Sequence, residues 1–129
     1  MNEPIAVTAA IVERDGEVLL AQRPPGGRHP GCWEFPGGKV EPGETPEQCL
    51  AREMTEEMGV EVRVGELLAG VRHDYPDLSL ELLAFRCSIV SGEPEDLHCS
   101  AHAWVRPSDL ESYDLLPPDV LLALALFRE

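Results

Sequence analysis

The segment from Gly38 to Val60 reads GKVEPGETPEQCLAREMTEEMGV and contains the clearest helix signal of the chain. Thr45 is a favourable N-cap, Pro46 suits the first helical position, and Gln48 completes a capping box. Gly59 ends the helix because glycine readily adopts the left-handed conformation of a C-cap. The sequence therefore predicts a helix that begins after Thr45 and ends at Gly59.

One face of this helix carries three carboxylates. Glu53, Glu56 and Glu57 lie at i, i+3 and i+4 and so share an arc of about 100°. Like charges at this spacing destabilise a helix, and the last two lie where the helix dipole disfavours anions. Residues 41–61 carry seven Glu and one base, Arg52. A solvated acidic face is one interpretation, but the pattern favours a hard divalent cation, Mg²⁺ first and Mn²⁺ next.

Alternating or apolar runs on both sides of the helix predict strands. Within the helix, Leu50, Met54 and Met58 recur every four residues and predict its buried stripe. The order of strands, helix, strands and helix indicates an α/β architecture with a mixed sheet. The expected strands cover 5–12, 18–21, 33–35, 60–71, 78–90 and 101–105, and the expected second helix covers 117–129.

Composition narrows the class of protein. The chain of 129 residues has no internal repeat or linker, which predicts one domain over 1–129. Its 24 acidic and 10 basic side chains give a net charge of −14, which disfavours nucleic acid polymers and anionic membranes as partners. We find neither a secretory signal nor a membrane-spanning run, and the four cysteines are expected to be reduced, so we expect a cytoplasmic protein.

The spacing of Gly38, Glu44 and the run Arg52–Val60 matches the Nudix box, here 38–60, at every defined position. The preceding run Trp33–Val40 resembles the MutT branch of the Nudix family. The resemblance implies a Nudix-type α/β/α sandwich with a mixed β-sheet between helices. It also implies a pyrophosphohydrolase that converts nucleoside triphosphates to monophosphates and pyrophosphate. Because the triphosphate and the carboxylate face are both anionic, metal ions must bridge them.

The resemblance assigns roles to the box residues one by one. Glu53, Glu56 and Glu57, with the carbonyl oxygen of Gly37, are the expected metal ligands. Glu53 is also expected to orient or deprotonate the attacking water. Arg52 is expected to pair with a box carboxylate and fix it, so that Glu53, Glu56 and Arg52 form the expected catalytic set; an ordinary surface ion pair is the alternative for Arg52. Glu44 is expected to tie the loop together without taking part in the chemistry.

The resemblance also implies a nucleotide pocket next to the box. Arg23 and Arg28 match positions that contact phosphates or sugar, and His29 could substitute for Arg28. Asp119 either reads the base edge, through its ability to accept or donate, or serves only as a helix N-cap or first-turn acid. The expected substrate-binding residues are Arg23, Arg28, Glu34, Phe35, Pro36, Gly37 and Asp119.

Two positions depart from the MutT pattern. His98 lies six residues before Trp104, where that branch usually has a Glu that serves as an extra metal ligand or base. A neutral imidazole can act as a base near pH 7 but binds Mg²⁺ poorly, and Glu95 or Asp96 could supply the oxygen instead. Leu78 stands where an Arg can contact an oxidised guanine, which weakens the case for a dedicated 8-oxo-guanine sanitiser.

Three functions follow from these observations. The leading one is a Mg²⁺-dependent nucleoside triphosphate pyrophosphohydrolase for 8-oxo-dGTP, CTP, dCTP or modified pyrimidine forms, the first of which would serve DNA repair. The second is an ADP-ribose or dinucleotide polyphosphate hydrolase, because Tyr75-Pro76 falls where some branches carry a specificity Tyr or Pro. The third is a catalytically silent nucleotide-sensing module, which the complete set of box glutamates disfavours. A monomer and a homodimer both remain open.

Overall fold

The computed structural model describes residues 3–127. Its elements lie close to the predicted positions, although β4 and β5 together form a longer hairpin than expected and η1 was not predicted. The end of the last predicted helix, residues 128 and 129, lies outside the described residues. The elements are β1 (Ile5–Arg14), β2 (Glu17–Gln22), β3 (Trp33–Glu34), α1 (Pro46–Met58), β4 (Glu61–Asp74), β5 (Ser79–Ser91), β6 (Ala101–Val105), the 3-10 helix η1 (Pro107–Ser112) and α2 (Pro117–Phe127).

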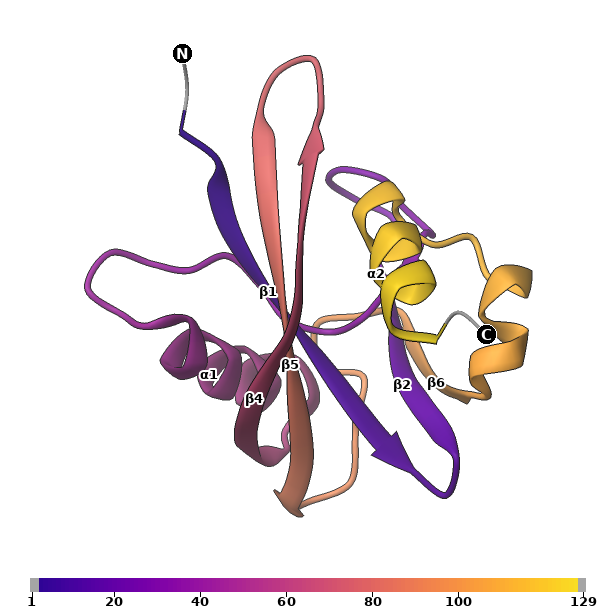
Figure 1. The fold of residues 1–129 in the computed structure, drawn as a ribbon. Helices are drawn as coiled ribbons and strands as arrows, with labels where there is room; N and C mark the ends of the chain where they lie inside the picture. The colour runs from indigo at the N-terminus through magenta and orange to yellow at the C-terminus, as the bar shows by residue number, and fades with distance from the viewer. Residues whose placement is uncertain (1–2, 128–129) are drawn as a thin grey trace.

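The sheet is mixed, as predicted, with the order β3-β2-β1-β5-β4 and with β6 paired to β2. β1 runs parallel to β5, with Ile5 opposite Leu80 and Val12 opposite Cys87. β4 and β5 form the long antiparallel hairpin seen at the centre of Figure 1. A parallel pair needs a crossover, and the chain between β1 and β5 supplies it through β2, β3, α1 and β4.

The two long helices cover opposite faces of the sheet (Figure 1). Alternate residues of β1 show this directly, because successive side chains of a strand point to opposite faces. Ala10 and Val12 join the core cluster that contains Leu50 and Met54 of α1. Ala9 and Ile11 of the same strand join the core cluster that contains Leu122 of α2. The expected α/β/α layering is confirmed.

Helix α1 has the predicted caps. The Thr45 side chain accepts a hydrogen bond from the Gln48 amide at 3.1 Å, and the Gln48 side chain accepts one from the Thr45 amide at 2.9 Å. Gly59 ends the helix with φ of 67°. Met54 and Met58, like Leu50, are fully buried, so the opposite side of the helix is left for the glutamates.

The loop before α1 lies against β1 and places the site. β1 and β2 pair only near their hairpin turn, and beyond it the Ala10 amide donates to Pro36 and the Thr8 amide to Gly38. A Cβ atom at Gly37 would lie 2.0 Å from the Thr8 carbonyl oxygen, and one at Gly38 would lie 2.3 Å from the Glu53 carboxyl carbon. Gly37 also has φ of 156°. Glycine at both positions therefore lets the backbone approach β1 and the glutamate face of α1 together.

Candidate active site

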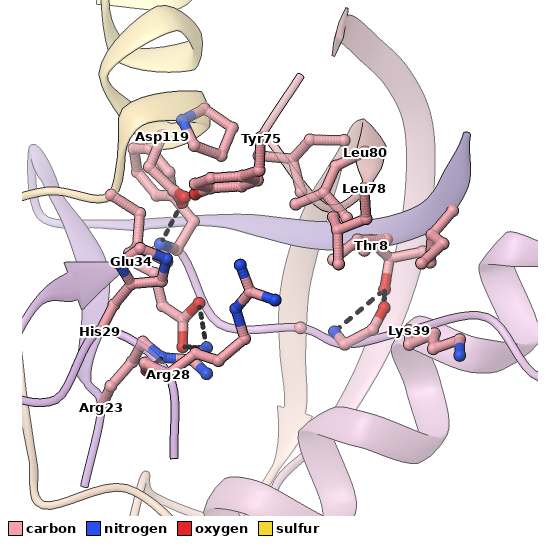
Figure 2. Close-up of a pocket in the computed structure, with 18 of the residues that line it drawn as sticks. Thr8, Arg23, Arg28, His29, Glu34, Lys39, Tyr75, Leu78, Leu80 and Asp119 are labelled. Carbon is pink, nitrogen blue, oxygen red and sulfur yellow. Dashed lines mark hydrogen bonds and ion pairs between the residues drawn. The ribbon is translucent and has the colours of Figure 1, made fainter. Parts of the chain in front are cut away.

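A cavity of about 440 Å³ opens where β1 and β2 diverge (Figure 2). Its floor is aliphatic and comes from Ile5 and Val7 of β1 and Leu80 and Leu82 of β5, residues that are register partners across the parallel pair. Six of the seven expected substrate-binding residues line it, whereas Pro36 is buried and does not. The six are Arg23, Arg28, Glu34, Phe35, Gly37 and Asp119.

Three acidic side chains line this cavity, and burial raises the pKa of each. Glu57 of the box has its pKa raised to about 8, first by burial and then by the charges of Glu34 and Glu53. Burial likewise raises the pKa of Glu34, which the Arg23 guanidinium at 3.3 Å partly offsets. The pKa of Asp119 is raised well above its ordinary value by burial and then by Glu34. The cavity therefore favours a ligand that carries cations or hydrogen-bond donors.

Asp119 lines the cavity at the end where α2 contributes its wall. Its side chain is 3% exposed, and Oδ1 accepts a hydrogen bond of 2.9 Å from the Phe35 amide. Asp119 lies in the first turn of α2, as one of the two sequence interpretations required. The bond to Phe35, however, joins α2 to the segment after β3, so the carboxyl group has a tertiary contact as well as a place in the helix.

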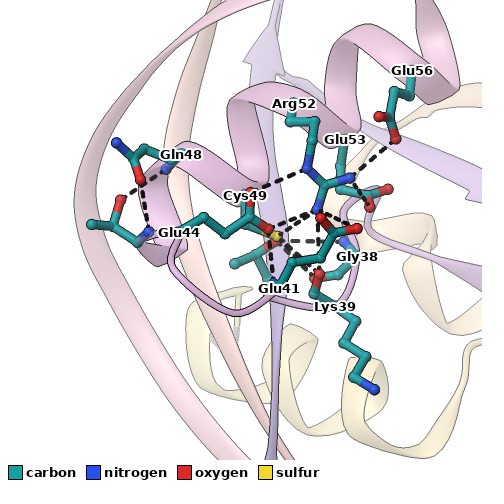
Figure 3. Close-up of polar contacts among 11 residues, drawn as sticks. Gly38, Lys39, Glu41, Glu44, Gln48, Cys49, Arg52, Glu53 and Glu56 are labelled. Atoms are coloured by element: carbon teal, nitrogen blue, oxygen red, sulfur yellow. Dashed lines mark hydrogen bonds and ion pairs between the residues drawn. The ribbon is translucent and has the colours of Figure 1, made fainter.

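Arg52 contacts two of the three glutamates that form the glutamate face of α1 (Glu53, Glu56 and Glu57), as Figure 3 shows for Glu53 and Glu56. Its guanidinium donates to Glu44 at 2.7 and 3.1 Å, to Glu53 at 2.9 Å and to Glu56 at 3.1 Å. Glu44 also accepts from the Glu41 amide at 2.9 Å, and the hydrogen bonds from Arg52 lower the pKa of Glu44 to about 2. The structure therefore agrees with the expected pairing of Arg52 with box carboxylates and with Glu44 tying the loop.

The NUDIX domain family matches residues 7–124, which is most of the chain. The protein belongs to the NUDIX family. This NUDIX protein is 42% identical over 118 residues to the CTP pyrophosphohydrolase of Escherichia coli K12, covering 92% of this chain and 87% of that one. It is 33% identical to the 8-oxo-dGTP diphosphatase of Haemophilus influenzae, covering 97% and 93% of the two chains. The crystal structure of a MutT NUDIX hydrolase from Burkholderia pseudomallei superposes with a TM-score of 0.86 at 29% identity, covering 97% and 99%.

NUDIX hydrolases generally need a divalent metal, and the residues of this NUDIX protein fit one in their chemistry. Oε2 of Glu57 is buried and has no hydrogen-bond partner among the described residues. A Cβ atom at Gly38 would lie 2.3 Å from the Glu53 carboxyl carbon, so a second carboxylate lies beside the loop. Within residues 3–127, no three His, Cys, Asp or Glu side chains are already arranged to hold a metal ion. Arg52 pairs with both Glu53 and Glu56, and Glu57 lines the cavity. The four-ligand set with Gly37 stays a prediction.

The two residues that depart from the MutT pattern, His98 and Leu78, lie in different parts of this NUDIX protein. His98 is exposed and is not among the residues that line the cavity; its amide donates to the Glu57 carbonyl at 3.3 Å. Asp96 bonds to Nδ1 of His102 at 2.5 Å, so its carboxylate already has a partner. Leu78 lines the cavity and extends its aliphatic surface. A role of His98 as base or ligand therefore stays a prediction without a contact that supports it.

The sequence interpretation missed part of the cavity wall. Tyr75 lines the cavity and extends toward Asp119 in Figure 2, and the charge of Asp119 contributes to raising the pKa of Tyr75, after burial. The available signal is Tyr75-Pro76 in the turn between two strands, a pair whose resemblance points to other branches of the family. Among residues 3–127, no helix is long and apolar enough to cross a membrane.

Proposed function

We propose that this NUDIX protein is a nucleoside triphosphate pyrophosphohydrolase that works with Mg²⁺, with Mn²⁺ as a substitute, and releases a nucleoside monophosphate and pyrophosphate. The observation that carries the proposal is one cavity that joins Glu57 of the box to Asp119 of α2. The names of the relatives support the same reaction class. The net charge of −14 favours small nucleotides over nucleic acid polymers.

The two ends of the cavity have different proposed roles, in phosphate chemistry at the Glu57 end and in base binding at the Asp119 end. At the Glu57 end, bound metal ions would neutralise the triphosphate and polarise the attacked phosphorus. Glu53 lies beside this end, against Gly38, where its free oxygen can take a proton from water. Arg52 holds the other oxygen of Glu53 at 2.9 Å and fixes the direction of that carboxylate. Arg23 and Arg28 are two of the cationic side chains that line the cavity, and they can bind phosphate or sugar.

The Asp119 end is proposed to bind the base. Oδ1 of Asp119 is occupied by the Phe35 amide, so Oδ2 remains for the ligand. A carboxyl group with a raised pKa can donate to the N3 acceptor of cytosine, whereas an ionised one accepts from its exocyclic amine. This chemistry and the similarity to a CTP pyrophosphohydrolase favour CTP and dCTP over 8-oxo-dGTP.

The reaction is tested by measuring pyrophosphate and phosphate release from a panel of nucleotides with Mg²⁺. We expect stoichiometric pyrophosphate, with CTP or dCTP giving the highest kcat/KM and 8-oxo-dGTP the next. ADP-ribose or a dinucleotide polyphosphate as the best substrate would replace this proposal with the second function. Binding without turnover of any nucleotide would instead favour the silent sensing module.

Substitution of Asp119 is expected to change base selection. Asp119→Ala should alter the ratio of kcat/KM between the best and the worst base by about tenfold, because one good base contact is worth about 1–3 kcal/mol of discrimination. Asp119→Asn keeps an oxygen for the Phe35 amide and serves as the matched variant for the structural contact. A ratio that stays within about threefold in both variants, with every nucleotide slowed alike, would limit Asp119 to stabilising α2.

A further inference from the structure

Two segments far apart in the sequence meet at the rim of the cavity. Arg28, from the loop between β2 and β3, forms a two-point ion pair with Asp77, from the turn between β4 and β5. The nitrogen–oxygen distances are 2.7 and 3.2 Å. This parallel pair of bonds fixes the direction of both side chains as well as their distance.

The ion pair frames the ring of Tyr75. The Arg28 guanidinium carbon lies 5.4 Å from the centre of this ring, and the His29 ring lies 5.4 Å away centre to centre. The His73 ring also packs against Tyr75 in an edge-to-face arrangement, at 4.5 Å between ring centres. Arg28, His29 and Tyr75 all line the cavity, whereas Asp77 does not. Asp77 can therefore act on a ligand only through the residues that it holds.

Each partner of the pair is anchored on its own side. The turn that carries Asp77 is closed by two backbone hydrogen bonds between Tyr75 and Leu78, at 2.7 and 3.3 Å. The carbonyl oxygen of Arg28 accepts from Nε of Arg23 at 2.8 Å, and Arg23 reaches on to Glu34 inside the cavity. The pair thus connects a tight turn, through Arg23, to the Glu34 side chain that lines the cavity.

The loop that carries Arg28 is held by this ion pair together with backbone hydrogen bonds from the Gly31 amide to Arg23 and from the Cys32 amide to His29. Residues 24–31 read PPGGRHPG, and three glycines together with three prolines leave it with few side chains to pack. Arg28 and Asp77 are both about half exposed, so their ion pair adds little to the stability of the whole fold. The ion pair instead orders the loop before a ligand binds, and this reduces the entropy that is lost on binding. Nε2 of His29 is buried without a hydrogen-bond partner among the described residues, which leaves it available to a ligand in the cavity.

We propose that Asp77 is a positioning residue for nucleotide binding, which holds Arg28, His29 and Tyr75 as the outer wall of the cavity by pairing with Arg28. The inference rests on the proposed function, because the ligand it concerns is the nucleotide in this cavity. We expect the wall to act on binding in the ground state and the transition state alike, because its residues belong to the β2–β3 loop and the β4–β5 turn and not to α1, which carries the box glutamates.

The test is the steady-state kinetics of Asp77→Asn with CTP and Mg²⁺. Loss of uniform binding raises KM and leaves kcat unchanged, so we expect KM to rise about fivefold and kcat to stay within about twofold. The control is Glu93→Gln, which breaks the exposed pair between Arg14 and Glu93 at 2.9 Å on residues that do not line the cavity. It should change neither constant, and the melting temperatures of all variants should match within a few degrees.

Two further measurements distinguish a positioning role of Asp77 from a general effect of its charge: the KM of a conservative variant and the dependence of KM on salt. Asp77→Glu keeps a carboxylate and should recover most of the KM. Added salt screens an exposed pair, so it should raise KM of the unsubstituted protein more steeply than KM of Asp77→Asn. An unchanged KM in Asp77→Asn would show an ordinary surface ion pair, and a lower KM would show that Asp77 withholds Arg28 from the phosphates; either result overturns the inference. Failure of the proposed function looks different, because the unsubstituted protein would then hydrolyse no triphosphate at all.

Discussion

Glu53→Gln is expected to lower kcat by at least about a hundredfold while the protein stays folded. General-base catalysis alone contributes about 10²–10⁴ in rate, and loss of a charged metal ligand adds to that. The glutamine keeps the shape of the side chain that Gly38 accommodates, and it can still accept the hydrogen bond from Arg52. The variant therefore removes charge and proton affinity without opening a gap beside the loop.

The measurement is kcat with saturating nucleotide and Mg²⁺, together with the melting temperature and the affinity for the nucleotide. Glu47→Gln is the matched control, because Glu47 lies exposed in the first turn of the same helix. The control should keep nearly full activity, and the affinity of Glu53→Gln for nucleotide should stay near that of the unsubstituted protein. A Glu53→Gln variant with more than about a tenth of the original kcat would remove Glu53 from the centre of the mechanism.

The second large effect is expected from divalent metal. One oxygen of Glu57 is buried and has no hydrogen-bond partner within residues 3–127, and Glu34 and Glu53 add negative charge near it. A cation that binds only the folded protein stabilises it, by about 2.7 kcal/mol at a hundred times its dissociation constant. Millimolar Mg²⁺ should therefore raise the melting temperature, and excess chelator should leave a folded, inactive protein. Turnover that persists in excess chelator would exclude the metal mechanism.

The pH dependence of this stabilisation has a definite sign. In metal-free protein the pKa of Glu57 is raised to about 8 from 4.5, so its contribution to stability is present below the ordinary pKa and is lost as pH rises through about 8. Metal needs the ionised carboxylate and must displace this proton at lower pH. The gain in melting temperature from Mg²⁺ should be larger at about pH 9 than at about pH 6. Glu57→Gln should remove most of that difference, and a gain that is independent of pH would assign the metal to other ligands.

Local rules explain how much of the fold was predictable from the sequence. The caps at Thr45 and Gly59 and the stripe of Leu50, Met54 and Met58 depend on residues within a few positions of each other, and α1 follows them closely. The alternation in β1 likewise predicted a strand that is buried on both faces. The 3-10 helix η1 was not predicted, because a short turn that starts at Pro107 has no repeating apolar pattern.

Contacts between distant residues explain what the sequence could not predict about the site. The family resemblance pointed to six residues that line one cavity in the structure. It did not indicate that Arg28 would pair with Asp77. Nor did it show that Asp119 would hold the Phe35 amide. Such partners lie dozens of positions apart, and they depend on how β1 and β2 diverge and on where the β4–β5 turn ends.

The close approach of Gly38 to Glu53 constrains how this protein can vary. A Cβ atom at position 38 would lie 2.3 Å from the Glu53 carboxyl carbon, so a side chain there requires the Glu53 carboxylate to move, and the allowed residues at the two positions depend on each other. A library that changes one position at a time would record a loss of activity at Gly38 without showing that the loss comes from displacement of the Glu53 carboxylate. Libraries that vary both together would instead reveal epistasis, with Gly38→Ala least harmful when position 53 carries a shorter acid. Engineering of this loop therefore has to vary positions 38 and 53 together.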